Sequence, residues 1–173
     1  MIFSGEPLLG KVDNGSFLIW GKVGEVDPPQ LVMPITNEPT KPRMCHNERF
    51  LNPWIKDYPI RLDCLTDLSL CVFYGHFQTT FDEKSGFDLV HLHPSWSTFS
   101  GFRWASWYFA YATLPFNWKA NAYIYYSIGL GATNFIRLHG VPCSHYIDNN
   151  YIDTSVRCAS SQARVIYISK ALV

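Results

Sequence analysis

The chain has 173 residues, of which 47% are hydrophobic and 16% aromatic, so an intrinsically disordered protein is excluded and a sizeable core is expected. Its formal net charge is zero, but residues 41–61 carry five basic and two acidic side chains, whereas residues 62–156 carry four basic and seven acidic ones. This pattern suits a polyanion site beside a metal site, although ordinary solvated surface produces it too.

Cysteine usage and the start of the chain bear on the compartment. The five cysteines, at positions 45, 64, 71, 143 and 158, are odd in number and irregularly spaced. The beginning of the chain lacks a basic region followed by a long apolar run. We therefore expect reduced thiols in an intracellular protein, cytoplasmic or nuclear. The most apolar stretch, WASWYFAYATLPF, is too short to span a bilayer.

The predicted elements begin with two strands. Residues 16–26 and 30–35 are strand-like and are separated by the turn signal of residues 27–29, Asp-Pro-Pro. Residues 37–43 form a loop that two prolines hold extended.

The middle of the chain predicts one short helix and several strands. Leucines at helical spacing predict a helix within residues 63–71, with Asp63 as a possible N-cap. Residues 74–82 read as a strand that ends in an acid, and residues 89–94 and 101–115 read as aromatic, β-rich hairpins.

The last predicted elements are a helix and a hairpin. Residues 123–138 have the pattern of an amphipathic helix, which residues 139–140, His-Gly, should end. A strand over residues 141–148 then leads into a turn at residues 149–150, and residues 151–157 form the returning strand.

Two acids fall at the expected strand ends, Asp82 and Asp148. Phosphoryl and nucleotidyl transfer with two divalent ions needs carboxylates that converge from neighbouring strands. The alternative is that both are ordinary turn or cap residues, as most isolated aspartates are.

Several blocks of sequence are informative through the order in which they follow one another along the chain. They are KPRMCHNERFLN (41–52), LDCLTDL (62–68), TFDEKSGFDLV (80–90), LPFNWKANAYIYYSIGL (114–130) and YID (146–148). This order resembles the fingers and palm of reverse transcriptases, and within that family the DIRS-type or related LTR-like retrotransposon enzymes. The resemblance covers residues 31–152.

The resemblance implies an α+β fold, with a palm of antiparallel sheet and packed helices beside a partial fingers region. It divides the chain into an N-terminal extension and fingers portion (1–80), a palm with motifs A, B and C (81–157) and a truncated tail (158–173). On this resemblance we expect the thumb to be missing, because the residues after 152 leave no room for a thumb or a ribonuclease H domain.

The resemblance also implies roles for individual residues. Asp82 matches the metal-binding aspartate of motif A, and Asp148 matches the first aspartate of motif C; both would be catalytic ligands of Mg²⁺ in a two-metal site. Five further residues would bind substrate: Lys41 and Arg43 on the incoming triphosphate, Phe87 as the aromatic gate against a 2′-hydroxyl, and Phe116 and Lys119 in motif B.

The chain departs from the family pattern at functional positions. Asn149 stands where motif C has a second acid, Asn117 where motif B has glycine, and Ala122 where a proline follows the motif B lysine. Residues 47–49 read Asn-Glu-Arg where the fingers have an aspartate before an aromatic and basic pair. Such changes indicate a decayed or domesticated retroelement fragment.

The implied family activity is RNA-directed DNA polymerisation, with an RNA or DNA primer–template and dNTPs as partners, Mg²⁺ as cofactor and no membrane. The changes above leave it open whether the chain is still an enzyme. A non-catalytic nucleic-acid-binding module and a remnant without function are the two alternatives.

Other candidate sites rest on weaker patterns. His91, His93, Cys143 and His145 could share a metal, but their spacing matches no metal motif. Trp104, Trp107, Tyr108 and Tyr111 could stack on bases, but strand alternation should place about half of them in the core. Cys143 and His145 as a nucleophile pair lack an orienting partner.

Overall fold

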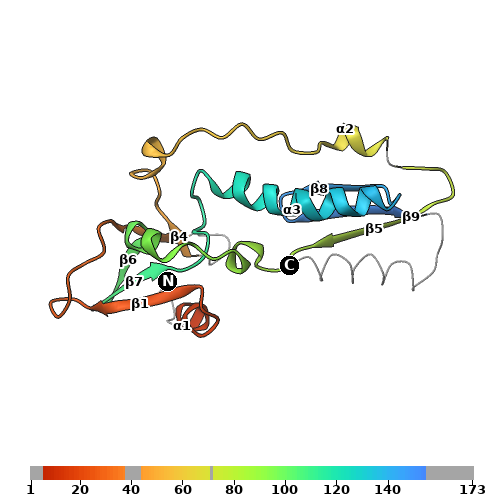
Figure 1. Cartoon of the computed structure of the whole chain (residues 1–173). Coiled ribbons are helices and arrows are strands. Elements are labelled where there is room, and N and C mark those ends of the chain that lie inside the picture. The colour runs from red at the N-terminus through yellow and green to blue at the C-terminus, as the bar shows by residue number, and fades with distance from the viewer. Residues whose placement is uncertain (1–5, 38–43, 71, 155–173) are drawn as a thin grey trace. The chain divides into compact units, whose positions relative to one another are not determined.

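The computed structural model describes residues 6–37, 44–70 and 72–154 (Figure 1). These residues form two compact units. Unit 1 contains the described residues up to Asp57 together with Phe87–Asn121, and unit 2 contains Tyr58–Gly86 together with the described residues from Ala122 onward. Each unit is thus built from two separate stretches, whereas the sequence suggested consecutive segments.

Unit 1 is centred on a four-stranded sheet of order β1-β7-β6-β2. Its strands are β1 (Phe17–Lys22), β7 (Trp107–Tyr111), β6 (Gly101–Trp104) and β2 (Val32–Met33). The pairs β1–β7 and β6–β7 are antiparallel, and β2 runs parallel to β6. The unit also contains helix α1 (Glu6–Asp13) and the antiparallel pair β3 (Ile35–Asn37) and β4 (Met44–His46).

The core of unit 1 is aromatic. Phe17 packs edge-on against Phe102 and Tyr111, at centroid distances of 5.1 and 4.7 Å, and Leu8 of α1 joins this cluster. Of the four aromatic residues considered as base-stacking candidates, Tyr111 is therefore a core residue, whereas Trp107 at the start of β7 is exposed. Strand alternation places both side chains on the same face of β7, so the difference follows from their positions at opposite ends of the strand.

Residues 89–94 are not a hairpin. His91 forms only an isolated bridge with Thr113, and the 3₁₀ helix η3 (Pro94–Phe99) follows at once. His93 is the N-cap of η3, with its Nδ1 accepting from the backbone N–H of Ser95. Proline at the first helical position favours this helix over a strand, so His91 and His93 do not share a strand face as the sequence suggested.

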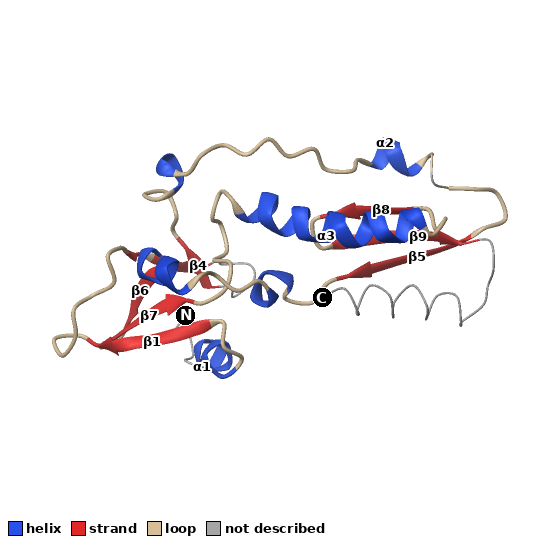
Figure 2. Ribbon diagram, in the orientation of Figure 1, coloured by secondary structure: helices blue, strands red, loops and turns tan. Residues whose placement is uncertain are grey.

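Unit 2 is a three-stranded antiparallel sheet of order β5-β9-β8 with a helix along it (Figures 1 and 2). The strands are β5 (Phe77–Asp82), β9 (Asn149–Thr154) and β8 (Cys143–Tyr146), and the helix is α3 (Asn121–Leu138). Ile136 of α3 packs with Cys143, Ile152 and Phe81, so one face of the sheet is covered by α3. No helix among the described residues has the length and apolar character needed to cross a bilayer.

The ends of α3 and of the β8–β9 hairpin test two predicted boundaries. Helix α3 ends before Gly140, whose φ of 76° takes the left-handed conformation expected after a helix. The hairpin turn consists of Ile147 and Asp148, and β9 already begins at Asn149. The predicted turn at residues 149–150 is therefore wrong by two residues. Ile147 has a φ of 56°, which is strained for a β-branched residue.

Asp63 was expected to cap the helix that follows it, and this expectation is wrong. Helix α2 (Leu65–Leu68) has Cys64 as its N-cap, and Asp67 accepts from the backbone N–H of Cys64. The carboxylate of Asp63 instead accepts from the backbone N–H of His145 at 3.0 Å and from Arg137 of α3 at 2.5 Å. Because β8 is an edge strand, Asp63 supplies an acceptor that no neighbouring strand offers.

Asp63 should make the stability of unit 2 depend on pH. Partial burial opposes ionisation, but the His145 N–H and the Arg137 guanidinium outweigh it and hold the pKa of Asp63 below its ordinary value of 3.8. A lowered pKa contributes stability that is present above the ordinary value and is lost as pH falls through the folded-state pKa.

We expect Asp63→Asn to destabilise unit 2 by about 1–3 kcal/mol at neutral pH and to flatten the loss of stability below about pH 4. Urea unfolding at several pH values, followed by hydrogen exchange of β8 amides, measures both effects. Asp27→Asn, at an exposed loop position of unit 1, is the control. An Asp63→Asn protein with the parent's acid unfolding profile would contradict the assignment.

Candidate active site

The register of unit 2 brings Asp82 and Asp148 to the same end of one sheet. Asp82 is the last residue of β5 and pairs with Asn149, the first residue of β9. The backbone N–H of Glu83 donates to the carbonyl oxygen of Asp148 at 2.9 Å. Two acids that lie far apart in the sequence are therefore held on adjacent backbone segments, although their role as metal ligands stays a prediction.

Strand alternation places the side chain of Asp82 on the face of the sheet that α3 does not cover. Phe81 points toward α3, because it packs with Ile136 and Ile152, so Asp82 lies on the opposite face. Its partner Asn149 shares that face, and both side chains are exposed. On β5 the same face carries Gln78 and Thr80, also exposed. We call this surface the polar face; it is open and rich in hydrogen-bonding groups around Asp82.

A third acid, Glu83, lies beside the pair but is already engaged. Its carboxylate accepts from the Tyr125 hydroxyl and, at 2.9 Å, from the side-chain amide of Asn150. Burial, the hydrogen bond to Glu83 and the charges of Glu83, Asp148 and Asp82 together raise the pKa of Tyr125. The Tyr125 hydroxyl therefore keeps its proton and donates it in the hydrogen bond to Glu83. A Cβ at Gly86 would lie 1.9 Å from its hydroxyl oxygen, so only glycine fits beside it.

The amide of Asn149 acts directly on Asp148. Its Nδ2 donates to Asp148 Oδ1 at 2.9 Å, so part of the carboxylate's acceptor capacity is used inside the chain. Among the described residues, no group of three or more His, Cys, Asp or Glu side chains is placed to hold a metal ion. Of the four candidate ligands, His91 and His93 belong to unit 1 and Cys143 and His145 to unit 2, and neither pair is part of such a group within its own unit.

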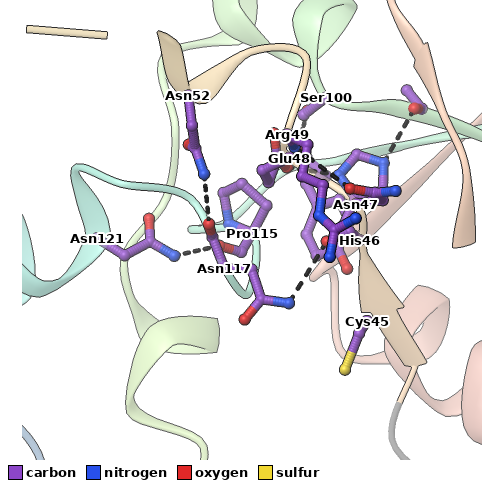
Figure 3. Close-up of polar contacts among 12 residues, drawn as sticks. Cys45, His46, Asn47, Glu48, Arg49, Asn52, Ser100, Pro115, Asn117 and Asn121 are labelled. Carbon is purple, nitrogen blue, oxygen red and sulfur yellow. Dashed lines mark hydrogen bonds and ion pairs between the residues drawn. The ribbon is translucent and has the colours of Figure 1, made fainter. Parts of the chain in front are cut away.

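In unit 1, the loop of the expected motif B is held by Asn52 of the 3₁₀ helix η1 (Asn52–Trp54) (Figure 3). The side chain of Asn52 donates to the carbonyl oxygen of Asn117 at 3.1 Å and accepts from the backbone N–H of Lys119 at 2.9 Å. In turn, Asn117 Nδ2 lies 3.5 Å from the carbonyl oxygen of His46. One amide side chain thus fixes both sides of the loop.

The backbone conformation at Asn117 is one that glycine adopts most easily. Its φ is 74°, in the left-handed region that residues with a Cβ adopt only at a cost in energy, and asparagine tolerates it better than most. Glycine, the residue that the resemblance leads us to expect here, would adopt the same backbone conformation without that cost.

We expect Asn117→Ala to destabilise unit 1 by about 1 kcal/mol, because alanine keeps the Cβ and loses the side-chain amide, whereas Asn117→Gly should stay within about 0.5 kcal/mol of the parent. Chemical denaturation followed by hydrogen exchange of β6 and β7 amides measures the difference. Equal stabilities of the two variants would contradict this account.

The other residues expected to bind substrate fall in two places. Phe87, in the 3₁₀ helix η2 (Gly86–Leu89), packs against Phe116 with ring centroids 6.4 Å apart, so the expected gate and a motif B residue do lie together. Lys119 Nζ forms an ion pair with Asp57 at 2.5 Å. Lys41 and Arg43 lie outside the described residues, so their predicted contact with a triphosphate stays a prediction.

Beside the motif B loop, unit 1 has a hollow of about 290 Å³, lined by Thr36, His46, Asn47, Glu48, Arg49, Asn52 and Asn117. Its inner wall is a buried pair (Figure 3): His46 Nδ1 lies 2.6 Å from Glu48 Oε1, and His46 Nε2 lies 3.1 Å from the carbonyl oxygen of Gly101. Glu48 also accepts, at its backbone carbonyl, from the N–H groups of Leu51 and Asn52. The pair therefore anchors the turn that carries Asn52.

Comparison with solved structures decides the fold. A foamy viral protease-reverse transcriptase in complex with dsDNA superimposes with a TM-score of 0.73 and 16% identity over 96% of this chain, and a second such complex with 0.72 and 15% over 94%. The native prototype foamy virus enzyme gives 0.69 and 15% over 95%. The fold is reverse-transcriptase-like. The chain spans 33%, 27% and 21% of the lengths of those three chains. Neither a family model nor a curated protein matches its sequence.

Within this reverse-transcriptase-like fold, the sequence missed the residues that support the site. Glu83 and Tyr125 form the hydrogen bond behind the two acids, and His46 and Glu48 form the buried pair behind the motif B loop. Position offered a weak signal for Glu83, which follows Asp82 directly. Tyr125 could not be found from spacing, because its partner Glu83 lies on a distant segment of the chain. His46 and Glu48 are only two residues apart, but nothing in the sequence marks the two side chains as buried.

Proposed function

We propose that the chain is the fingers and palm portion of an RNA-directed DNA polymerase from a retroelement of DIRS or related LTR-like type. In this proposal it binds a primer–template of RNA or DNA, and its nucleotidyl transfer is impaired. The observation that carries it is the register of β5 with β9, which places Asp82 and Asp148 at one open end of the palm-like sheet. The polar face beside them offers groups that suit a hydrated polyanion.

The oxygen ligands at this sheet end suit Mg²⁺. Magnesium in nucleotidyl-transfer sites is held by one or two carboxylates, with water and substrate phosphates completing the octahedron. Asp82 and Asp148 would be those carboxylates, and Glu83 would stay bound to Tyr125 and Asn150. When bound, the ion supplies charge neutralisation at the reacting phosphate. Asp82 and Asp148 contribute negative charge and position, and Tyr125 holds Glu83 in place.

The impairment follows from Asn149. A carboxylate at this position would add a full negative charge next to Asp148, whereas the amide donates a hydrogen bond to it. This same observation favours the second candidate function, a domesticated module that binds nucleic acid without catalysis. The two candidates share the partner and differ only in whether bond formation persists.

Primer extension and binding separate these candidates. We expect the parent protein to bind a primer–template with an affinity that falls steeply as salt rises, since phosphate contacts release counterions. Extension on an RNA template with Mg²⁺ or Mn²⁺ should be weak and should vanish in Asp82→Asn, while Asp27→Asn, an exposed loop control, should match the parent.

The outcomes have distinct meanings. Extension that depends on Asp82 supports the polymerase, and salt-dependent binding without extension supports the non-catalytic module. A protein that binds no primer–template even at low salt would refute both, and extension unaffected by Asp82→Asn would show that the site is misassigned.

A further inference from the structure

Two aromatic side chains of unit 1 are far more exposed than large apolar groups usually are. Phe50 is 78% exposed and Trp54 is 84% exposed. They lie on the turn that precedes and includes η1, between the buried Glu48 and the half-buried Ile55. Neither side chain belongs to the aromatic core, so packing in the core does not explain why aromatic residues occupy this turn.

The turn itself is well fixed. The N–H groups of Leu51 and Asn52 donate to the carbonyl of Glu48, Trp54 N–H donates to Leu51, and Ile55 N–H donates to Asn52. These bonds wind the backbone into consecutive helical turns, which place the two aromatic residues on successive turns. Through Asn52, the turn is also bonded to the motif B loop. The two aromatic side chains therefore project from a backbone segment that hydrogen bonds keep in one conformation.

The charge around the two rings is positive. Arg49 and Lys56 are exposed, next to Phe50 and close to Trp54. The two acids of the same stretch already have partners within the chain: Glu48 forms the buried pair with His46, and Asp57 forms an ion pair with Lys119. The surface of residues 49–56, which we call the aromatic–basic turn, therefore combines rings open to solvent with two cations that form no ion pair with any residue that the structure describes.

We propose that the aromatic–basic turn binds an unpaired stretch of nucleic-acid strand, with Phe50 and Trp54 stacking on bases and Arg49 and Lys56 contacting phosphates. Exposed aromatics beside a basic groove bind single strands without sequence preference, because every unpaired base offers a π-face. A base-paired duplex offers mainly its phosphates. The proposal rests on the proposed function for the class of partner, and it goes beyond it by naming the strand state and the residues.

Fluorescence anisotropy with a labelled oligouridylate, and with the same strand annealed into a blunt duplex, tests the proposal. Phe50→Ala and Trp54→Ala should each weaken single-strand binding roughly 5- to 100-fold while changing duplex binding less than about twofold. Trp54→Phe should retain most of the affinity. Lys56→Ala should weaken both and lower the salt slope by about one.

Trp96→Ala is the matched control, since Trp96 is 48% exposed in unit 1 on η3, a helix without basic residues. It should bind both probes as the parent does. Because Phe50 and Trp54 are exposed, their alanine variants should keep the parent's circular dichroism spectrum and unfolding midpoint.

The result that overturns the proposal is single-strand binding by Phe50→Ala and Trp54→Ala within twofold of the parent, which would leave the two rings for a protein partner. If primer–template binding persists in that case, the proposed function stands and only this inference falls. If the parent binds neither probe nor a primer–template, both fall. Equal losses for single strand and duplex would also overturn it, because stacking would not be the cause.

Discussion

Replacing His46 by leucine is expected to destabilise unit 1 by about 3–5 kcal/mol, because the substitution leaves Glu48 as a buried acid without its partner. His46 is 1% exposed and Glu48 is 2% exposed, and their side chains meet at 2.6 Å. The second oxygen of Glu48 is buried with no hydrogen-bond partner among the described residues. Leucine in place of His46 would leave both oxygens in that condition.

The geometry also defines the protons that the pair holds. His46 faces an acid oxygen at Nδ1 and the carbonyl oxygen of Gly101 at Nε2, so Nε2 must carry a proton to bond the carbonyl. A second proton between Nδ1 and Oε1 is needed whether the pair is written as two ions or as two neutral groups. Removal of the ring removes both donors, and the carbonyl of Gly101 also loses its partner.

A double variant tests this explanation. His46→Leu with Glu48→Met removes the buried acid together with the ring, so it should recover most of the stability that His46→Leu loses. Chemical denaturation combined with hydrogen exchange of β6 and β7 amides measures unit 1. His91→Leu, an exposed histidine of the same unit, is the control and should change stability by less than about 0.5 kcal/mol. A double variant as unstable as the single one would reject the buried-charge account.

Restoring an acid in motif C is expected to strengthen divalent-ion binding without restoring robust synthesis. In Asn149→Asp, a second negative charge replaces an amide that donates to Asp148 at 2.9 Å. At about 4 Å and an effective dielectric of about 20, one added unit-charge interaction amounts to roughly 4 kcal/mol. If that were realised only in the transition state, it would correspond to a rate factor on the order of a thousand. Without the ion, the added charge repels Asp148, so the variant should be less stable than the parent.

Titration calorimetry with Mg²⁺ and with Mn²⁺ measures the change in affinity, and thermal unfolding with and without the ion measures the linked gain in stability. Asn134→Asp adds the same charge at an exposed position of α3 and should leave both quantities unchanged. Asn149→Asp in the Asp82→Asn background should lose the gain. Unchanged affinity in Asn149→Asp, or robust extension by the parent, would contradict the view that this position limits the site.

Local patterns predicted the main elements of unit 2, whereas helix α1 and strand β4 of unit 1 were not predicted. The apolar spacing of residues 123–138 and the glycine that follows predicted α3, and the β-rich run ending in Asp82 predicted β5. The prediction failed where the role of a side chain depends on a partner from a distant segment. Asp63 looked like a cap, but its carboxylate is taken by His145 and Arg137 of distant segments.

In the candidate site, too, features set by local sequence could be predicted, and features set by tertiary contacts or unusual backbone angles could not. The two acids at the sheet end could be proposed from their place after strand-like runs and from the order of the motifs. The turn was misplaced, because Ile147 adopts a φ that a β-branched residue seldom takes and no sequence rule would assign to it. Tyr125 gave no signal, since an aromatic residue on an amphipathic helix is expected in the core.

The interleaving of the two units has a consequence for the order in which a ribosome delivers them. Strand β1 has to wait for β7, its partner in the sheet, until the chain has passed through all of β5 and η3. Strand β5 in turn waits for β9, which emerges only after α3. Neither sheet can form on the nascent chain while its first strand is alone, so unpaired strand edges stay exposed until the partner strand is synthesised. Such a chain is exposed to chaperones and to aggregation for longer than one whose units follow each other in sequence.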